Sequence, residues 1–270
     1  MNDVHNFNPA NPANPALTEP ALTPFDKKTN GGPDRAVALQ SYRERAAGYD
    51  RSSANILAIR AMAIHLLGVR PGDVVFDVAC GTGPTLLPLA AMAGPEGRVI
   101  GIEQSPEMAA IARARLAGAG EGTESDAGTA AGNAPMAGAA AIDIIEAPVE
   151  DAVLPARADR MLFCYTHDVL QNPHALANLF AAAKPGARVV VVGIRLVSWW
   201  LAPLNLLTCW RTRHYLSTFR GLSEPWAPLR AYCPDLTVVR TYHAGTSYLA
   251  TGRTPLAART ARTPRESCQT

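Results

Sequence analysis

The sequence lacks the features that mark several special classes of protein. It has no block of basic residues, and 25 Lys and Arg against 23 Asp and Glu leave a formal net charge of +2. Charge therefore gives no support to a nucleic-acid partner or to a membrane surface.

The five cysteines form no CxxC pair and no Cys/His spacing typical of zinc. We expect no metal site, and reduced thiols in a cytoplasmic protein. The N-terminus lacks a positive start followed by an apolar run, so no signal peptide is expected.

Three stretches have few of the large apolar side chains that a core requires. Residues 1–34 repeat Asn-Pro-Ala three times, which predicts a disordered N-terminal tail because proline fixes φ and removes a donor. Residues 117–141 are Gly or Ala at 16 of 25 positions, which predicts a flexible insertion in a surface loop. Residues 253–270 are polar and predict a second disordered tail. One domain is expected over 35–252.

The longest apolar run, 189–210, is interrupted by Gly193, Arg195, Pro203 and Asn205. A membrane-spanning helix needs about 20 predominantly apolar residues. A buried strand followed by an amphipathic helix explains the run better, so no stable membrane insertion is expected.

Hydrophobic periodicity predicts strands alternating with helices, an order typical of a parallel sheet covered on both faces. The expected strands are 74–78, 98–102, 142–146, 160–165, 187–193, 236–241 and 246–251. The expected helices are 41–50, 53–67, 85–92, 106–116, 173–183 and most of 199–219. Ligands of such sheets bind beyond the carboxyl ends of the strands.

A glycine turn follows the first of these strands. Asp77-Val78-Ala79-Cys80-Gly81-Thr82-Gly83 leads into a helix, and glycine lets the backbone approach a ligand closely. The second strand leads to Glu103, 20 residues after Gly83, which is the spacing of an acid that accepts ribose hydroxyls. Ser105-Pro106 can cap the next helix, so the Glu103 carboxylate is expected to be free for a ligand.

The same turn lacks the third glycine of a dinucleotide site. Leu86 stands where that glycine belongs, and Pro84 removes an amide from the helix start, where a pyrophosphate needs a donor. Both departures disfavour an NAD- or NADP-dependent oxidoreductase, which stays as an alternative.

Together these segments resemble the class I S-adenosylmethionine-dependent methyltransferases of small-molecule type. Residues 75–83 resemble the first motif of that family and 101–108 the second, and the similarity extends over roughly 40–252. The resemblance implies a three-layer α/β/α Rossmann-like fold with a mostly parallel seven-stranded sheet. It also implies S-adenosyl-L-methionine as cofactor, and methyl transfer to O, N or C of a small metabolite. The aromatic-rich stretch described below suggests that this metabolite is apolar or aromatic.

The resemblance also implies roles for particular residues. Asp77, Ala79, Gly81 and Gly83 would face the methionine moiety, and Glu103 would hold the ribose. Gln104 and Met108 would flank the adenine, whose amino group would be taken by Glu150 or Asp151. Tyr49 belongs to a Tyr-Asp helix similar to one that covers the cofactor in the family. A catalytically inactive cofactor-binding module of the same fold stays as a further alternative.

The residues after the fourth strand bear on the acceptor. His167 lies at the expected mouth of the site and has the ordinary pKa of a base near neutrality. Methyltransferases of DNA bases typically carry Asn/Asp-Pro-Pro-aromatic there, whereas this chain has Cys164-Tyr165-Thr166-His167. We therefore expect no nucleic-acid substrate.

Four tryptophans lie between 199 and 226: Trp199, Trp200, Trp210 and Trp226. They can line an apolar acceptor pocket, pack a helix onto the sheet, or form a homodimer interface. The sequence leaves these three interpretations open.

Overall fold

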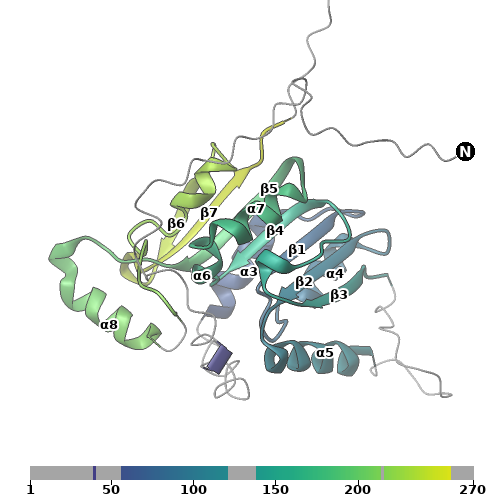
Figure 1. Ribbon diagram of the computed structural model, residues 1–270, viewed down its shortest axis with the longest axis horizontal. Helices are drawn as coiled ribbons and strands as arrows, with labels where there is room; N and C mark the ends of the chain where they lie inside the picture. Colours follow the sequence, from purple (N-terminus) through teal and green to yellow (C-terminus); the bar gives the residue numbers. More distant parts are fainter. Residues whose placement is uncertain (1–38, 41–55, 121–137, 214–215, 257–270) are drawn as a thin grey trace, which may run out of the picture. The chain divides into compact units, whose positions relative to one another are not determined.

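The centre of the fold is a seven-stranded sheet in the order β3-β2-β1-β4-β5-β7-β6 (Figure 1). The computed structural model describes residues 39–40, 56–120, 138–213 and 216–256. Six strands run parallel, and β7 runs antiparallel to both β5 and β6. The strands are β1 Val74–Val78, β2 Arg98–Glu103, β3 Ala141–Glu146, β4 Ala158–Cys164, β5 Ala183–Ile194, β6 Thr237–Tyr242 and β7 Ser247–Arg253.

Side chains of the central strands alternate between two buried cores, one on each face of the sheet. On one face, Val75, Val99 and Leu162 pack with α3 (Leu57–Leu67), α4 (Leu86–Ala93) and α5 (Pro106–Gly120). On the other, Phe76, Ile100 and Met161 pack with α7 (Pro173–Ala181). A strand buried on both faces has to be apolar at successive positions, as these strands are. The expected three-layer α/β/α fold is confirmed.

The strand order indicates at which edge of the sheet a ligand is expected to bind. The chain runs outward from β1 to β2 and β3, then returns to β4 on the other side of β1. The carboxyl ends of β1 and β4 therefore flank the point where the order reverses, with Val78 paired to Phe163. Open α/β sheets bind ligands at this point.

Several expected boundaries are wrong. Residues 117–120 belong to α5 and Ala141 to β3, so the expected insertion is shorter, and its part over 121–137 lies outside the described residues. Arg253 pairs with Arg188 at the end of β7, and the buried Thr254 donates to the Lys184 carbonyl at 2.7 Å. The expected C-terminal tail therefore cannot begin at 253, because these residues complete the sheet edge.

Two expected helices differ from the observed ones. The segment 199–219 forms a short 3₁₀ turn, Trp199–Leu201, and α8, Ala202–Thr212, and no helix is assigned over the described residues 216–219. The helix expected over 41–50 lies outside the described residues, as does the N-terminal segment 1–38. No helix in the described ranges is both long and apolar enough to cross a membrane.

A buried ion pair joins the amino ends of β1 and β4. Asp73 Oδ2 accepts from Arg160 Nε at 2.7 Å and from the Arg70 amide at 2.8 Å, and the two side chains are 14% and 8% exposed. Asp73→Ala would leave the Arg160 guanidinium buried without its anion. We expect it to lower the free energy of unfolding by about 3 kcal/mol, measured by urea denaturation.

The control is Asp143→Ala, which breaks the exposed Arg98–Asp143 pair of the same length. Screening by water makes that pair worth less than about 1 kcal/mol. Equal losses in the two variants would show that burial of the Asp73–Arg160 pair does not matter.

Candidate functional site

In the turn between β1 and α4, every second residue has a left-handed backbone conformation. Ala79, Gly81 and Gly83 have φ of 51°, 60° and 72°. The Cys80 amide donates to the Ile102 carbonyl at 3.0 Å, which fastens the turn to β2, and the Gly83 amide closes it on Cys80. Ala79 is strained, because a side chain disfavours positive φ. Such strain is typical of segments that clamp a ligand.

The two glycines of this turn have different surroundings. A Cβ added to Gly81 would meet no atom within 4 Å, whereas one on Gly83 would lie 2.9 Å from Leu86 Cδ1 and 3.0 Å from Ala112 Cβ. Gly81 therefore faces open space. At position 83, by contrast, a side chain would clash with residues of α4 and α5, so glycine is required there. Leu86 is fully buried, with Cδ2 only 3.1 Å from a Cβ built on Gly101. The position that a dinucleotide-binding fold keeps as glycine is thus occupied here by Leu86, which packs in the core.

Glu103 ends β2 beside this turn and is 4% exposed. Its Oε2 accepts from the Gly81 amide at 2.9 Å, and its Oε1 accepts from the Ser105 amide at 2.8 Å. The expectation that its carboxylate is free was therefore wrong. The Ser105 side chain does cap α5, through the Met108 amide at 3.3 Å, but its own amide still needed an acceptor. The Gln104 amide is a third donor to this carboxylate, which leaves about one of its four lone-pair sites for a ligand. Burial raises the pKa of Glu103, against three backbone hydrogen bonds that lower it.

Asp77 lies inside the protein at the carboxyl end of β1. Its side chain accepts a hydrogen bond from the Thr85 hydroxyl and is 1% exposed. Burial raises its pKa to about 7, despite the Thr85 hydrogen bond and the positive charge of Arg60. Arg60 also interacts with Cys164 at the end of β4. Asp77 and Arg60 thus link the glycine turn to the strand that leads into the cavity described below.

The remaining expected cofactor residues are spread over the same edge of the sheet. Gln104 is partly exposed beside Glu103, whereas Met108 is 1% exposed and packs inside. Glu150 and Asp151 form a 3₁₀ turn after β3, which Asn178 holds by donating to the Val149 and Ala152 carbonyls at 2.8 and 2.9 Å. The Ala147 amide donates to the Glu103 carbonyl at 3.1 Å, so this turn starts close to Glu103. Tyr49 lies outside the described residues.

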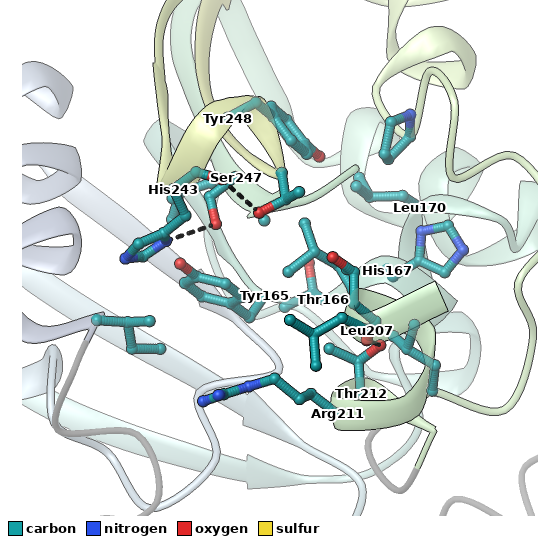
Figure 2. A pocket seen from close by; sticks show the side chains of 18 of the residues that line it. Tyr165, Thr166, His167, Leu170, Leu207, Arg211, Thr212, His243, Ser247 and Tyr248 are labelled. Carbon is teal, nitrogen blue, oxygen red and sulfur yellow. Dashed lines mark hydrogen bonds between the residues drawn. The ribbon is translucent and has the colours of Figure 1, made fainter. Parts of the chain in front are cut away.

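A cavity of about 400 Å³ lies beyond the ends of β4 and β5 (Figure 2). Its walls come from the β4–α6 connection, the end of β5, α8 and the β6–β7 turn. Apolar and small groups dominate, with Leu170, Val192, Leu204 and Leu207 among them. Tyr165 has φ of 61°, a second strained residue at a strand end. Thr166 Oγ1 is buried with no hydrogen-bond partner among the described residues.

His167 is the first residue of α6 (His167–Leu170) and lines this cavity. Its Nε2 lies 2.9 Å from the Arg220 carbonyl oxygen, which can only accept, so the neutral ring carries its proton on Nε2. Nδ1 is then a bare acceptor, buried and without a partner within the described ranges. Burial lowers the pKa of His167, which favours this neutral form. A neutral imidazole with a fixed tautomer is a competent proton acceptor.

Sequence reasoning missed much of the cavity wall. Ser247 and Tyr248 enter it at the start of β7, and Arg211 enters it from α8. Figure 2 shows His243 on the side opposite His167, with Nδ1 3.1 Å from Ser247 Oγ. The burial of β7 predicts an inward Tyr248, but no local pattern predicts which end of that strand meets the cavity.

The interpretation that the tryptophans line the pocket is wrong, because none of the four belongs to the cavity wall. Trp199, Trp200 and Trp210 do not belong to the cavity wall and are 86%, 66% and 62% exposed. Only Trp226 is buried, where it packs against Tyr248 with ring centroids 4.6 Å apart. The wall contributed by α8 is made instead of Leu204, Leu207, Thr208, Arg211 and Thr212.

Comparison with known proteins shows which family the glycine turn and its neighbouring strands resemble. Residues 75–186 match the family described as "Methyltransferase domain". This segment of the chain is therefore similar to the class I methyltransferases, whose cofactor is S-adenosylmethionine. S-adenosylmethionine fits the residues present in this methyltransferase domain. Gly81 leaves open space, Glu103 keeps a lone-pair site beside it, and a cofactor without a pyrophosphate loses nothing from Leu86 and Pro84.

Individual relatives match part of the chain. It is 32% identical over 114 residues to nocamycin O-methyltransferase of Saccharothrix syringae, covering 42% of this chain and 40% of the relative. It is 28% identical over 135 residues to ubiquinone/menaquinone biosynthesis C-methyltransferase UbiE of Ectopseudomonas mendocina, covering 49% and 46%. The chain therefore spans less than half the length of these relatives.

A solved structure supports the fold. The SAM-dependent O-methyltransferase of Thermotoga maritima superposes with a TM-score of 0.50 at 14% identity, covering 76% of this chain and 67% of that one. At this identity the likeness concerns the fold alone.

Two alanine substitutions test the glycine turn. Gly81→Ala and Gly83→Ala each strain a left-handed residue by about 1 kcal/mol. Gly83→Ala also pushes against Leu86 and Ala112, so we expect a melting temperature several degrees lower than that of Gly81→Ala. Gly81→Ala should instead weaken binding of S-adenosylhomocysteine about tenfold in calorimetry, because its methyl group enters the open space. Full affinity in Gly81→Ala would show that the cofactor does not approach this turn.

The raised pKa of Asp77 makes a prediction about pH. Between its ordinary value of 3.8 and its native value of about 7, the folded state holds a proton that the unfolded state has released. Stability therefore falls as pH rises through this window. Asp77→Asn keeps a neutral side chain and should remove this fall, measured by urea denaturation across the window. Parallel curves for the two proteins would contradict an elevated pKa at Asp77.

Proposed function

We propose that this chain transfers a methyl group from S-adenosylmethionine to O, N or C of a small, apolar or aromatic metabolite. The observation that carries the proposal is the position of the cavity. It begins at Tyr165, directly after β4, and β4 pairs with β1, which leads into the glycine turn. Cofactor turn and cavity thus lie at neighbouring strand ends, as a direct transfer between two bound molecules requires.

The cofactor half of the site uses residues that the family resemblance implies. Gly81 gives the backbone room for the methionine moiety, with Asp77 and Ala79 shaping the turn. Glu103 offers its remaining lone-pair site to the ribose hydroxyls. Gln104 and the turn with Glu150 and Asp151 lie at the adjoining strand end, where the adenine would extend.

The acceptor half favours a compact apolar molecule. Cavities of about 300–1,000 Å³ hold small-molecule ligands, with a few polar groups fixing their orientation. Here leucines and Val192 supply apolar walls, and Thr166 and His167 supply buried polar atoms that lack partners among the described residues. Relatives named for O-methylation of nocamycin and C-methylation in quinone biosynthesis support an acceptor of this class.

Methyl transfer requires the protein mainly to align the two reactants. Bound S-adenosylmethionine supplies an activated methyl group on a sulfonium. The turn and cavity bring the two reactants together, and their mostly apolar walls exclude water. Where the acceptor must lose a proton, His167 Nδ1 takes it, with the ring held by the Arg220 carbonyl.

The first experiment measures thermal unfolding with S-adenosylhomocysteine, and separately with NAD and NADP. At 100 times its dissociation constant a ligand stabilises the native state by about 2.7 kcal/mol. We expect stabilisation by S-adenosylhomocysteine alone, followed by turnover with a panel of hydroxylated aromatics and quinols. Stabilisation by a dinucleotide alone would overturn the assignment. Cofactor binding without turnover on any acceptor would favour the inactive module.

The role of His167 is tested by His167→Gln. Loss of a general base lowers turnover by about a hundredfold or more, whereas affinity for S-adenosylhomocysteine should stay unchanged. His174→Gln, on the exposed start of α7, is the matched control and should change neither quantity. Undiminished turnover in His167→Gln would remove it from the mechanism.

A further inference from the structure

Helix α8 exposes large apolar side chains to solvent, which is the reverse of the usual amphipathic pattern. None of its 11 residues is buried. Pro203, Leu206 and Trp210 recur at the spacing of one helix face and are exposed. Leu206 is 73% exposed, and Trp199 and Trp200 extend the apolar surface from the preceding turn. We call Trp199, Trp200, Leu206 and Trp210 the outer face of α8. Several large apolar side chains exposed within one short segment are typical of an interaction site.

The outer face is held outward by specific contacts on the other side of the helix. Asn205 Oδ1 accepts from the Val197 amide, and Asn205 Nδ2 donates to the Val197 carbonyl, both at 2.9 Å. Leu204, Thr208 and Thr212 line the cavity, and Figure 2 shows Thr212 beside Leu207 on that side. Turning the helix to bury Trp210 would break the Asn205 pair. The exposure is therefore part of the fold.

The segment around this face has no acidic residue. No Asp or Glu occurs from 169 to 223, whereas four arginines lie between 195 and 220. Of these, Arg211 lines the cavity and Arg195 lies over the Trp226 ring, whereas Arg213 lies against the outer face at Trp210. The Arg213 guanidinium carbon lies 5.0 Å from the centroid of the Trp210 ring, and both residues are exposed. The near-zero net charge of the whole chain conceals this local excess.

We propose that the outer face of α8 docks on the surface of an anionic phospholipid bilayer, with the helix lying in the plane of the interface. Tryptophan and leucine enter the boundary between head groups and acyl chains, and Arg213 meets a lipid phosphate. Tryptophan is enriched at this depth because its ring is apolar and its N–H is polar. A second copy of the chain fits less well, because a symmetric contact would oppose arginines to arginines with no acid in the segment to pair with them.

Co-sedimentation of the full chain with lipid vesicles tests the proposal. Vesicles of phosphatidylcholine and phosphatidylglycerol in equal parts should bind the protein, and added salt should release it. Vesicles of phosphatidylcholine alone should bind much less. Trp210→Ser should lower the partition coefficient about tenfold, and Arg213→Gln should lower it for anionic vesicles only. The control is Val153→Ser, which removes an 84% exposed apolar side chain from another surface and should leave binding unchanged.

Two outcomes overturn the proposal. One is no binding of the folded wild-type chain to anionic vesicles. The other is a wild-type dimer in analytical ultracentrifugation that Trp210→Ser converts to monomer, since the outer face would then be covered by a second copy. Neither result depends on methyl transfer, so the outcome is separate from that of the proposed function.

Discussion

The Glu103 carboxylate is the contact on which the cofactor half of the site depends. One oxygen holds the Gly81 amide of the turn after β1, and the other holds the Ser105 amide at the start of α5. A single buried side chain thus sets the spacing between the glycine turn, the end of β2 and the first residue before the next helix. Hydrogen bonds to an ionised group are the stronger kind. Because burial raises the pKa of Glu103, the same carboxylate is also easier to protonate than an exposed one.

The acceptor half depends on a second set of contacts, made by the short helix α6. His167 Nε2 meets the Arg220 carbonyl, and Asp168 Oδ2 accepts from the Ser217 amide at 3.1 Å and from its hydroxyl at 2.7 Å. These bonds tie the end of β4 to the segment that follows α8. The proposed base, the cavity wall and the helix with the exposed tryptophans are therefore joined through one connection. A change in the position of α8 would reach His167 through Ser217 and Arg220.

The central strands could be predicted from sequence because burial on both faces demands continuous apolar runs, as in Val189-Val190-Val191-Val192. The glycine turn and Glu103 were recognisable because backbone geometry restricts the residue types there. Contacts between distant segments were not predictable. The free carboxylate expected at Glu103 neglected the Ser105 amide, whose need for an acceptor shows only once α5 is placed. For the tryptophans the sequence left a pocket wall, packing on the sheet and a homodimer interface open. The orientation of α8 is set by the Asn205–Val197 pair and by a cavity that no local pattern reveals.

The position of β7 has a consequence for how the polypeptide is made. This strand comes after all the others in the chain, yet it lies between β5 and β6 and is the only strand that pairs with β6 in the described sheet. During synthesis β5, with its run Val189-Val190-Val191-Val192, keeps an open edge until β7 has left the ribosome. An unpaired, valine-rich edge is a template for pairing with other chains. Ribosomes stalled before Ser247 would therefore release a product prone to aggregate, even though most of both cores has already been synthesised.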